Sequence, residues 1–277
     1  MTLSSFGSRM TNLFPAILAC ALVAPTVSNA AAACAPAEPP ASWSSEKEAA
    51  PASPPNDPKS VNPLTLVIFR HAEKPLGDDG VMVEDGNLGH DAEKRLSGLP
   101  DSLLSQFGCP DMLVTTNPSG KMLNKKTGRY FNYVRPLATI APVSRRIDFP
   151  VWTPYGYKES EYLARDLLSD HAFLPDESGR PKTIFISWER NAVGKLFDYL
   201  KDLGGLRSLS GGTLTVDGVQ TRCEEPKKWA QCDFDSIWLV RIKDGAICLT
   251  VKSEGLNSES FQRRCKGAES TTDSQKQ

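Results

Sequence analysis

The stretch Leu64-Thr-Leu-Val-Ile-Phe-Arg-His-Ala-Glu-Lys-Pro75 decides the fold. Its first part is a short and nearly continuous apolar run, which is typical of a strand buried on both faces in a parallel sheet. The pattern breaks at Arg70 and His71, where two polar side chains follow the strand directly. Because α/β proteins bind ligands beyond the carboxyl ends of such strands, this break is a candidate site.

The two residues at the break have complementary chemistry. Arg70 carries a planar fork of donors that suits a phosphate or a carboxylate. The imidazole of His71 is largely neutral near pH 7 and can act as a nucleophile or carry a proton. An Arg-His pair can also be a plain surface pair, but the preceding strand and the following Glu-Lys-Pro favour a functional interpretation.

The rest of the chain alternates between strand-like and helix-like segments. Such alternation predicts an α/β fold with a largely parallel sheet and helices on both faces. Asp244-Gly245 separates the last two apolar runs and predicts a hairpin there. The expected strands are 64–70, 111–116, 182–188, 235–243 and 246–252, and the expected helices are 92–107, 133–147, 159–169 and 191–203.

Several segments, taken in order, resemble the histidine phosphatase superfamily. Arg70-His-Ala-Glu-Lys-Pro75 is similar to the Arg-His-x-Glu-Lys-Pro motif of one subgroup. Tyr133-Val-Arg-Pro-Leu resembles the start of the helix that carries the second phosphate-binding arginine of the family, here Arg135. Ile184-Phe-Ile-Ser-Trp-Glu resembles the strand before its second pocket histidine. Residues 95–104 and 112–118 resemble the helix and the strand that follow the first motif, so the likeness covers about residues 62–252.

The resemblance implies a fold and a reaction. The fold is a phosphoglycerate mutase-like three-layer sandwich with a mostly parallel central sheet. In the implied reaction His71 attacks phosphorus in line and becomes the covalent phosphocarrier, while Arg70 and Arg135 hold the phosphoryl oxygens. The substrate would be a small phosphorylated molecule, and neither a metal nor an organic cofactor is expected.

One departure from the family pattern concerns position 190. The second pocket histidine is expected after Trp188-Glu189, and this chain has Arg190. A guanidinium can donate to phosphoryl oxygens, but it cannot exchange protons near neutrality. Two functions therefore stay open. One is an exported phosphomonoesterase that acts through a phosphohistidine on His71, and the other is a phosphate-binding protein without turnover on the same fold.

The sequence does not identify the acid that would protonate the leaving group. Related enzymes often carry one in the region of Tyr155-Gly-Tyr, and other carboxylates flank the pocket motifs. His171 is expected at the opposite edge of the sheet, where a structural role is favoured. The candidates for the acid are Glu73, Glu159, Glu161, Glu189 and His90.

The ends of the chain differ in composition from its middle. Residues 1–33 contain a single charge, Arg9, and an apolar run before small residues, as in a secretory signal peptide. Residues 34–62 form a lead-in rich in Pro, Ala and Ser that cannot fold alone. We expect the catalytic domain at 63–265 and a polar tail at 266–277. Export to the periplasm or the medium is favoured over lipid anchoring at Cys20, and no stable membrane span is expected.

Charge and cysteine content bear on the partners of the protein and on the state of its cysteines. Without residues 1–33 the chain has 31 basic and 33 acidic residues, so nothing indicates a nucleic acid partner. Seven cysteines become six if Cys20 is removed, and an even number in an exported protein favours disulfides over metal binding. The expected pairs are Cys34 with Cys109, Cys223 with Cys232, and Cys248 with Cys265.

Overall fold

A computed structural model describes residue 34 and residues 61–79, 81–169, 171–175, 179–216, 218–256, 259 and 261–265. The expected signal peptide, nearly all of the lead-in and the polar tail lie outside these ranges. Within them, no helix is both long enough and apolar enough to cross a membrane.

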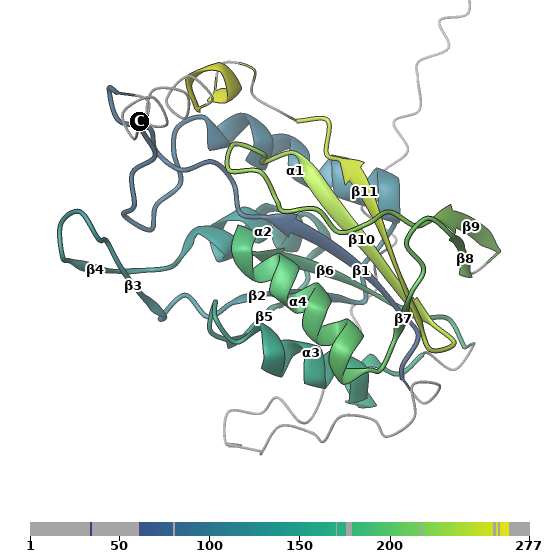
Figure 1. Ribbon diagram of the computed structural model, residues 1–277. Coiled ribbons are helices and arrows are strands. Elements are labelled where there is room, and N and C mark those ends of the chain that lie inside the picture. The colour runs from purple at the N-terminus through teal and green to yellow at the C-terminus, as the bar shows by residue number, and fades with distance from the viewer. Residues whose placement is uncertain are drawn as a thin grey trace, which may run out of the picture.

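A seven-stranded sheet forms the centre of the molecule (Figure 1). Its strand order is β5-β2-β6-β1-β10-β11-β7, and four of the six neighbouring pairs are parallel. The antiparallel pairs are β1 with β10 and β10 with β11. The strands are β1 (Leu64–Arg70), β2 (Met112–Thr116), β5 (Val151–Tyr155), β6 (Lys182–Trp188), β7 (Arg207–Ser208), β10 (Ser236–Lys243) and β11 (Ala246–Ser253).

Helices cover both faces of the sheet, as the alternation of segments predicted. Along β1, Leu66 and Ile68 belong to the apolar cluster that contains the residues of α3 and α4. Val67 and Phe69 point the other way, into the cluster built with α1 and α2. The predicted three-layer α/β fold is therefore confirmed. The helices are α1 (Ala92–Phe107), α2 (Arg135–Ile147), α3 (Ser160–Ser169) and α4 (Arg190–Leu203), and a short 3-10 helix, η4, spans His171–Phe173.

The register of β1 and β6 sets the position of the candidate site. The two strands run parallel, and Arg70 pairs with Trp188 at their carboxyl ends. The backbone N–H of His71 continues this ladder and donates to the Trp188 carbonyl at 3.1 Å. The residues that follow each strand, His71 on one and Glu189 on the other, therefore leave the sheet at the same edge.

The hairpin prediction at the last two strands is also confirmed. Asp244 and Gly245 have φ of 51° and 69° between β10 and β11. Both residues have positive φ, which is the conformation that a two-residue hairpin turn needs. This turn joins the two strands at the amino-terminal end of β1, where Leu64 pairs with Ile242.

Several strands escape the sequence prediction because their patterns are weak. β5 contains Pro154, a residue that is confined to edge strands, and β5 lies at the edge of the sheet. β7 has only two residues, and the remaining four strands form two small hairpins outside the main sheet. These are β3 (Lys121–Leu123) with β4 (Tyr130–Asn132), and β8 (Thr213–Val216) with β9 (Val219–Arg222).

The disulfide prediction is correct for one pair and wrong for two. Cys34 is bonded to Cys109, as expected, with a Cα–Cα distance of 5.4 Å. Cys223 is bonded to Cys248, because an antiparallel bridge between Glu224 and Leu249 places it beside β11. Cys232 and Cys265, which close the third bond, pack together with Phe234 and Phe261 in a separate apolar cluster. Proximity in sequence was therefore the wrong guide to the pairing.

Candidate functional site

His71 is enclosed at the carboxyl edge of the sheet. Its exposed fraction is 1%, and its ring meets Tyr133 and Phe234 edge-on, with centroid distances of 5.9 and 6.0 Å. Thr139 of α2 accepts a hydrogen bond from the Ala72 N–H at 2.7 Å and donates to the Arg135 carbonyl at 2.8 Å. The backbone around the histidine is thus tied to the start of α2.

The hydrogen bonding of His71 defines its tautomer. Nδ1 lies 2.7 Å from the Ala72 carbonyl oxygen and donates a proton to it, so the lone pair of the neutral ring lies on Nε2. Burial and the positive charges of Arg70 and Arg135 hold the pKa of His71 well below its usual value. The ring therefore stays neutral at physiological pH, which is the form that a nucleophile requires.

The segment that follows β9 holds the side chain of Arg70 in place. Its Nη1 donates to the carbonyl oxygens of Gln231 and Asp233 at 2.6 and 2.8 Å. The guanidinium stacks on Phe234, with its central carbon 3.6 Å from the ring centroid. Its Nε is buried and has no hydrogen-bond partner. Burial and the charge of Arg190 lower the pKa of Arg70 to about 9, so the side chain stays a cation at neutral pH.

Arg135 reaches the site from the first turn of α2. Pro136 follows it, a residue suited to the start of a helix because its missing N–H would have no partner there. The guanidinium is fully buried, and its charge is among those that act on His71. Its Nη2 donates to Glu84 at 3.1 Å, and Glu84 also pairs with Lys74 at 2.5 Å.

Arg190 is the first residue of α4, and Glu189 is the N-cap of that helix. The Glu189 carboxylate accepts hydrogen bonds from the N–H groups of Asn191 and Ala192 at 2.7 and 3.0 Å. The half-buried Arg190 is, among charged groups, the strongest influence on the pKa of Arg70. The structure therefore brings the predicted histidine and arginines to one edge of the sheet, namely Arg70, His71, Arg135 and Arg190.

The candidates for the proton donor have different surroundings. Glu73 is buried, both of its carboxylate oxygens lack a hydrogen-bond partner, and burial raises its pKa. Glu159 accepts from the Gly156 N–H at 2.7 Å, and Glu161 pairs with Arg165 at 2.6 Å. His90 is exposed and contacts Glu93 on the surface, so it does not reach the pocket.

Arg95 and Glu254 support the backbone of Arg70, and the sequence did not predict this role for them. Arg95 of α1 forms a bidentate ion pair with Glu254 at 2.5 and 2.6 Å, and both side chains are buried. The same guanidinium donates from Nη2 to the Arg70 carbonyl at 2.7 Å. The signal in the sequence is an arginine one helical turn before Leu99, on the face of α1 that packs against the sheet.

Tyr133 also lies in the site, although it was noted in the sequence only as part of a motif. It precedes α2, and its ring lies edge-on to both His71 and Tyr157. Its hydroxyl is buried without a hydrogen-bond partner, and burial, together with Glu189, raises its pKa. A neutral phenol that lacks a partner is available to donate to an oxygen atom of a bound ligand.

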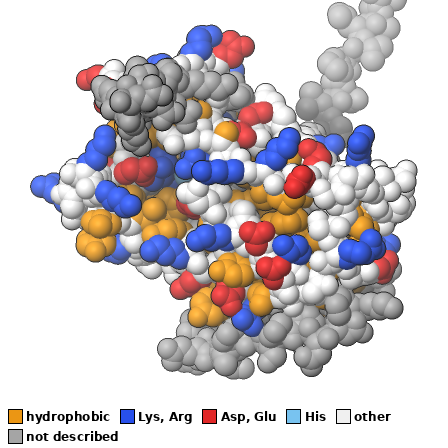
Figure 2. Space-filling view, in the orientation of Figure 1, with side chains coloured by type: hydrophobic (Ala, Val, Ile, Leu, Met, Phe, Trp, Pro, Cys, Tyr) orange, Lys and Arg blue, Asp and Glu red, His pale blue; other side chains and the backbone are white. Residues whose placement is uncertain are grey.

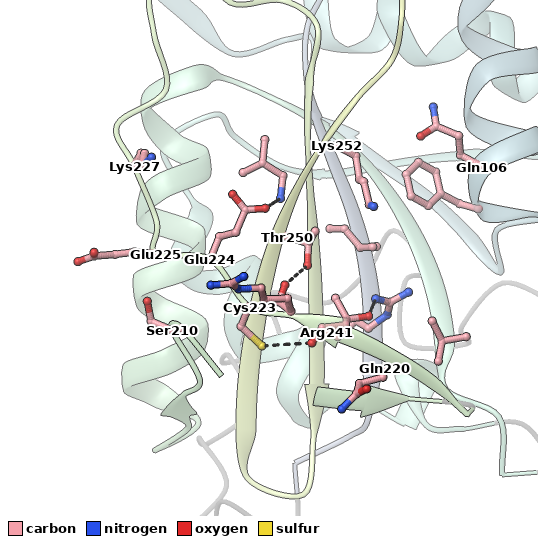
Figure 3. A pocket seen from close by; sticks show the side chains of 17 residues that line it. Gln106, Ser210, Gln220, Cys223, Glu224, Glu225, Lys227, Arg241, Thr250 and Lys252 are labelled. Atoms are coloured by element: carbon pink, nitrogen blue, oxygen red, sulfur yellow. Dashed lines mark hydrogen bonds between the residues drawn. The ribbon is translucent and has the colours of Figure 1, made fainter. Parts of the chain in front are cut away.

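A separate groove of about 1020 Å³ lies on the β10 and β11 strands, between the end of α1 and β9 (Figure 3). Glu224 accepts from the Val251 N–H at 2.9 Å, and the Thr250 hydroxyl donates to the Arg222 carbonyl at 3.1 Å. None of the residues of the candidate site lines this groove. The molecular face in Figure 2 has cations and carboxylates interspersed, without a large region of one sign.

No group of His, Cys, Asp and Glu side chains within the described ranges is arranged to hold a metal ion. The candidate site is instead built from one imidazole and several guanidinium groups. Side chains of these types are suited to oxyanions, because guanidinium donors pair with phosphate oxygens in a planar fork.

Comparison with known proteins finds similarity at the level of structure. No family model matches the sequence, and a search of curated proteins gives no match. A phosphoglycerate mutase from Bacillus anthracis is similar with 11% identity, 75% of this chain and 99% of the other covered, and a TM-score of 0.39. The protein histidine phosphatase SixA complexed with tungstate has 15% identity, coverage of 69% and 98%, and a TM-score of 0.39. Bacillus stearothermophilus YhfR has 14% identity, coverage of 70% and 98%, and a TM-score of 0.34.

Proposed function

We propose that this protein is an exported phosphomonoesterase that hydrolyses a small phosphorylated substrate through a phosphohistidine on His71. The observation that carries the proposal is the state of His71. It is a neutral ring with Nδ1 tied to a backbone carbonyl, and two buried arginines act on it. The motif resemblance around Arg70 and Arg135 supports the same reaction.

The proposed reaction has two displacements at phosphorus. In the first, Nε2 of His71 forms the P–N bond as the ester P–O bond breaks, and the departing alkoxide takes a proton from an acid. In the second, water attacks the phosphohistidine, the P–N bond breaks and inorganic phosphate leaves. Arg70, Arg135 and Arg190 stabilise the negative charge on the equatorial oxygens during both steps.

Glu73 is the acid that the surroundings favour among the candidates. Its carboxyl group is buried, neither carboxylate oxygen has a hydrogen-bond partner, and burial raises its pKa, which is the direction of shift that a proton donor needs. Glu159, Glu161 and Glu189 are each already engaged by a backbone N–H or by an arginine. The variant Glu73→Gln would test whether Glu73 is this acid.

The cysteines are consistent with export. Three disulfides join six cysteines, a pattern that persists in oxidising compartments. We propose that residues 1–33 are a signal peptide, that 34–62 lead into the domain, that 63–265 form the domain and that 266–277 form a tail.

The second candidate function is phosphate binding without turnover, and Arg190 is the observation that favours it. Three guanidinium groups near one histidine would hold a phosphoryl group strongly. Position 190 of this chain is an arginine, where the resembling family has its second imidazole. Binding and hydrolysis need the same cations. Only a measurement of turnover can therefore distinguish the two functions.

The test is incubation of the purified, oxidised protein with para-nitrophenyl phosphate, followed by rapid quenching and detection of protein-bound phosphate. We expect release of para-nitrophenol together with an adduct that is labile in acid and stable in base. Saturable binding of inorganic phosphate with neither product nor adduct would instead support the binding protein. The absence of all three results would refute both functions.

Arg190 provides a prediction that separates binding from catalysis. Arg190→Ala should weaken the affinity for inorganic phosphate by about 1–3 kcal/mol, because it removes a charged donor. Arg190→His should retain phosphate binding and raise the rate of phosphorylation, because an imidazole can donate to the oxyanion. Pre-steady-state phosphorylation and phosphate inhibition measure the two effects. Unchanged values for Arg190→Ala would show that Arg190 does not contact the phosphoryl group.

A further inference from the structure

The loop that follows Lys74 places a carboxylate on the cations of the candidate site. This loop comprises residues 75–79 and 81–89 and joins β1 to α1 (Figure 1). The two oxygens of Glu84 are divided between two cations. Oε1 lies 2.5 Å from the Lys74 Nζ, and Oε2 lies 3.1 Å from the Arg135 Nη2. Glu84 thus bridges the two cations.

The loop also engages the remaining terminal nitrogen of Arg135. Nη1 donates to the Asn87 carbonyl at 3.4 Å and lies 3.9 Å from the Asp85 Oδ1. The Arg135 side chain has no exposed surface, while that of Glu84 is 41% exposed. The two terminal nitrogens of the guanidinium therefore face the loop, whereas its buried Nε has no hydrogen-bond partner. A ligand that binds the terminal nitrogens must replace part of the loop contacts.

The loop is held in this position by contacts with its surroundings. Asn124, between β3 and β4, donates from Nδ2 to the Glu84 carbonyl at 2.6 Å. Gly86 has φ of 83°, and a Cβ atom at this position would lie 2.2 Å from the Asn132 carbonyl oxygen. A side chain at position 86 would therefore push the loop away from β4, so the close approach depends on glycine.

The cations that Glu84 bridges are the ones that surround His71. Arg135 and Lys74 both act on the imidazole electrostatically, and Lys74 follows it by three residues. Together with the 1% exposure of His71 and of Arg70, this arrangement is a buried cluster of cations around the imidazole. Its positive charge is already partly neutralised by the carboxylate of the loop.

We infer that Glu84 is a specificity-determining residue that competes with the phosphoryl group of the substrate for Arg135 and Lys74. This inference rests on the proposed function, because it concerns the same site. A carboxylate carries one negative charge, whereas a phosphate monoester carries close to two above its second pKa. The site therefore selects dianionic phosphoryl groups over ligands with a single carboxylate, which gain little by replacing Glu84.

The test compares Glu84→Gln with the intact protein, using inorganic phosphate as the probe and isothermal titration calorimetry as the measurement. Glu84→Gln should bind phosphate about tenfold more tightly, since the competing charge is lost. It should also bind acetate measurably, so that the preference for phosphate over acetate falls. Glu84→Ala should show the same two changes.

Asp78→Asn is the matched control, because Asp78 lies in the same loop, is exposed, and carries the same charge. It should leave phosphate affinity within about twofold of the intact protein, as expected for a solvent-screened charge. An equal gain in Asp78→Asn would overturn the inference, because net charge alone would then explain the gain. Unchanged affinity in both Glu84 variants, with an unchanged melting profile, would overturn it as well.

The two proposals can fail separately. Turnover of para-nitrophenyl phosphate by the intact protein, without any gain in phosphate affinity in the Glu84 variants, would refute the competition and leave the phosphatase standing. A gain in phosphate affinity in those variants, without phosphoprotein in any of them, would support the competition and favour the binding protein.

Discussion

His71→Ala is expected to abolish hydrolysis of para-nitrophenyl phosphate, with a loss of at least about 10³-fold in kcat and no trapped phosphoprotein. The reason is that Nε2 of His71 is the atom proposed to form the P–N bond, and alanine has no nucleophilic atom at this position. The measurement is steady-state kinetics together with quantification of acid-labile phosphate on the protein.

His90→Ala is the matched control for this variant, since the side chain of His90 is 90% exposed and its Nδ1 lies 3.3 Å from the carboxylate of Glu93 on the surface. It should keep turnover and adduct within about twofold of the intact protein, as is usual for surface substitutions. Near-native activity in His71→Ala would exclude the phosphohistidine mechanism. Inorganic phosphate binding by the variant would show that the arginines still assemble.

Glu254→Ala should lower the free energy of unfolding by about 3–5 kcal/mol, which is the expected cost of leaving one partner of a buried ion pair without the other. Both side chains of the pair are nearly inaccessible, with exposed fractions of 1% for Arg95 and 0% for Glu254. Because Arg95 also donates to the Arg70 carbonyl, the variant should impair phosphate binding in addition. Urea denaturation followed by circular dichroism measures the stability.

Asp101→Ala is the control for the ion pair. Asp101 pairs with Arg146 at 3.2 Å, but these side chains are 75% and 44% exposed. Its removal should cost less than about 1 kcal/mol, because water screens exposed pairs. Similar losses in Asp101→Ala and Glu254→Ala would mean that burial of the Arg95 pair contributes nothing to the stability of the domain.

The central fold could be predicted from the sequence because hydrophobic periodicity is strong there. β1 and β6 are continuous apolar runs, and the turn at Asp244 and Gly245 has a specific chemical signature. β5 was missed because Pro154 weakens the strand pattern, and an edge strand tolerates proline. The small hairpins were missed because their short strands are largely exposed and lack an apolar run.

The residues of the candidate site could be predicted only where they lie at the end of a strand or at the start of a helix. Arg70, His71 and Arg190 adjoin the ends of parallel strands, so the topology of the sheet brings them together. Arg95 and Glu254 are separated by 159 residues, and only the packing of α1 beside the end of β11 joins them. Glu84 lies in a loop without periodicity, so no pattern in the sequence points to its contact with Arg135.

The disulfide of Cys232 lies inside the segment that holds Arg70. The carbonyl oxygens of Gln231 and Asp233, on either side of this cysteine, accept the two hydrogen bonds of the Arg70 guanidinium. Reduction would remove the covalent link of this segment to Cys265 and leave only non-covalent contacts, such as that of Phe234 with Phe261, to position the carbonyls that hold Arg70. Protein prepared in a reducing cytosol would therefore be a poor sample for any phosphatase assay, and oxidation state has to be verified before a negative result is interpreted.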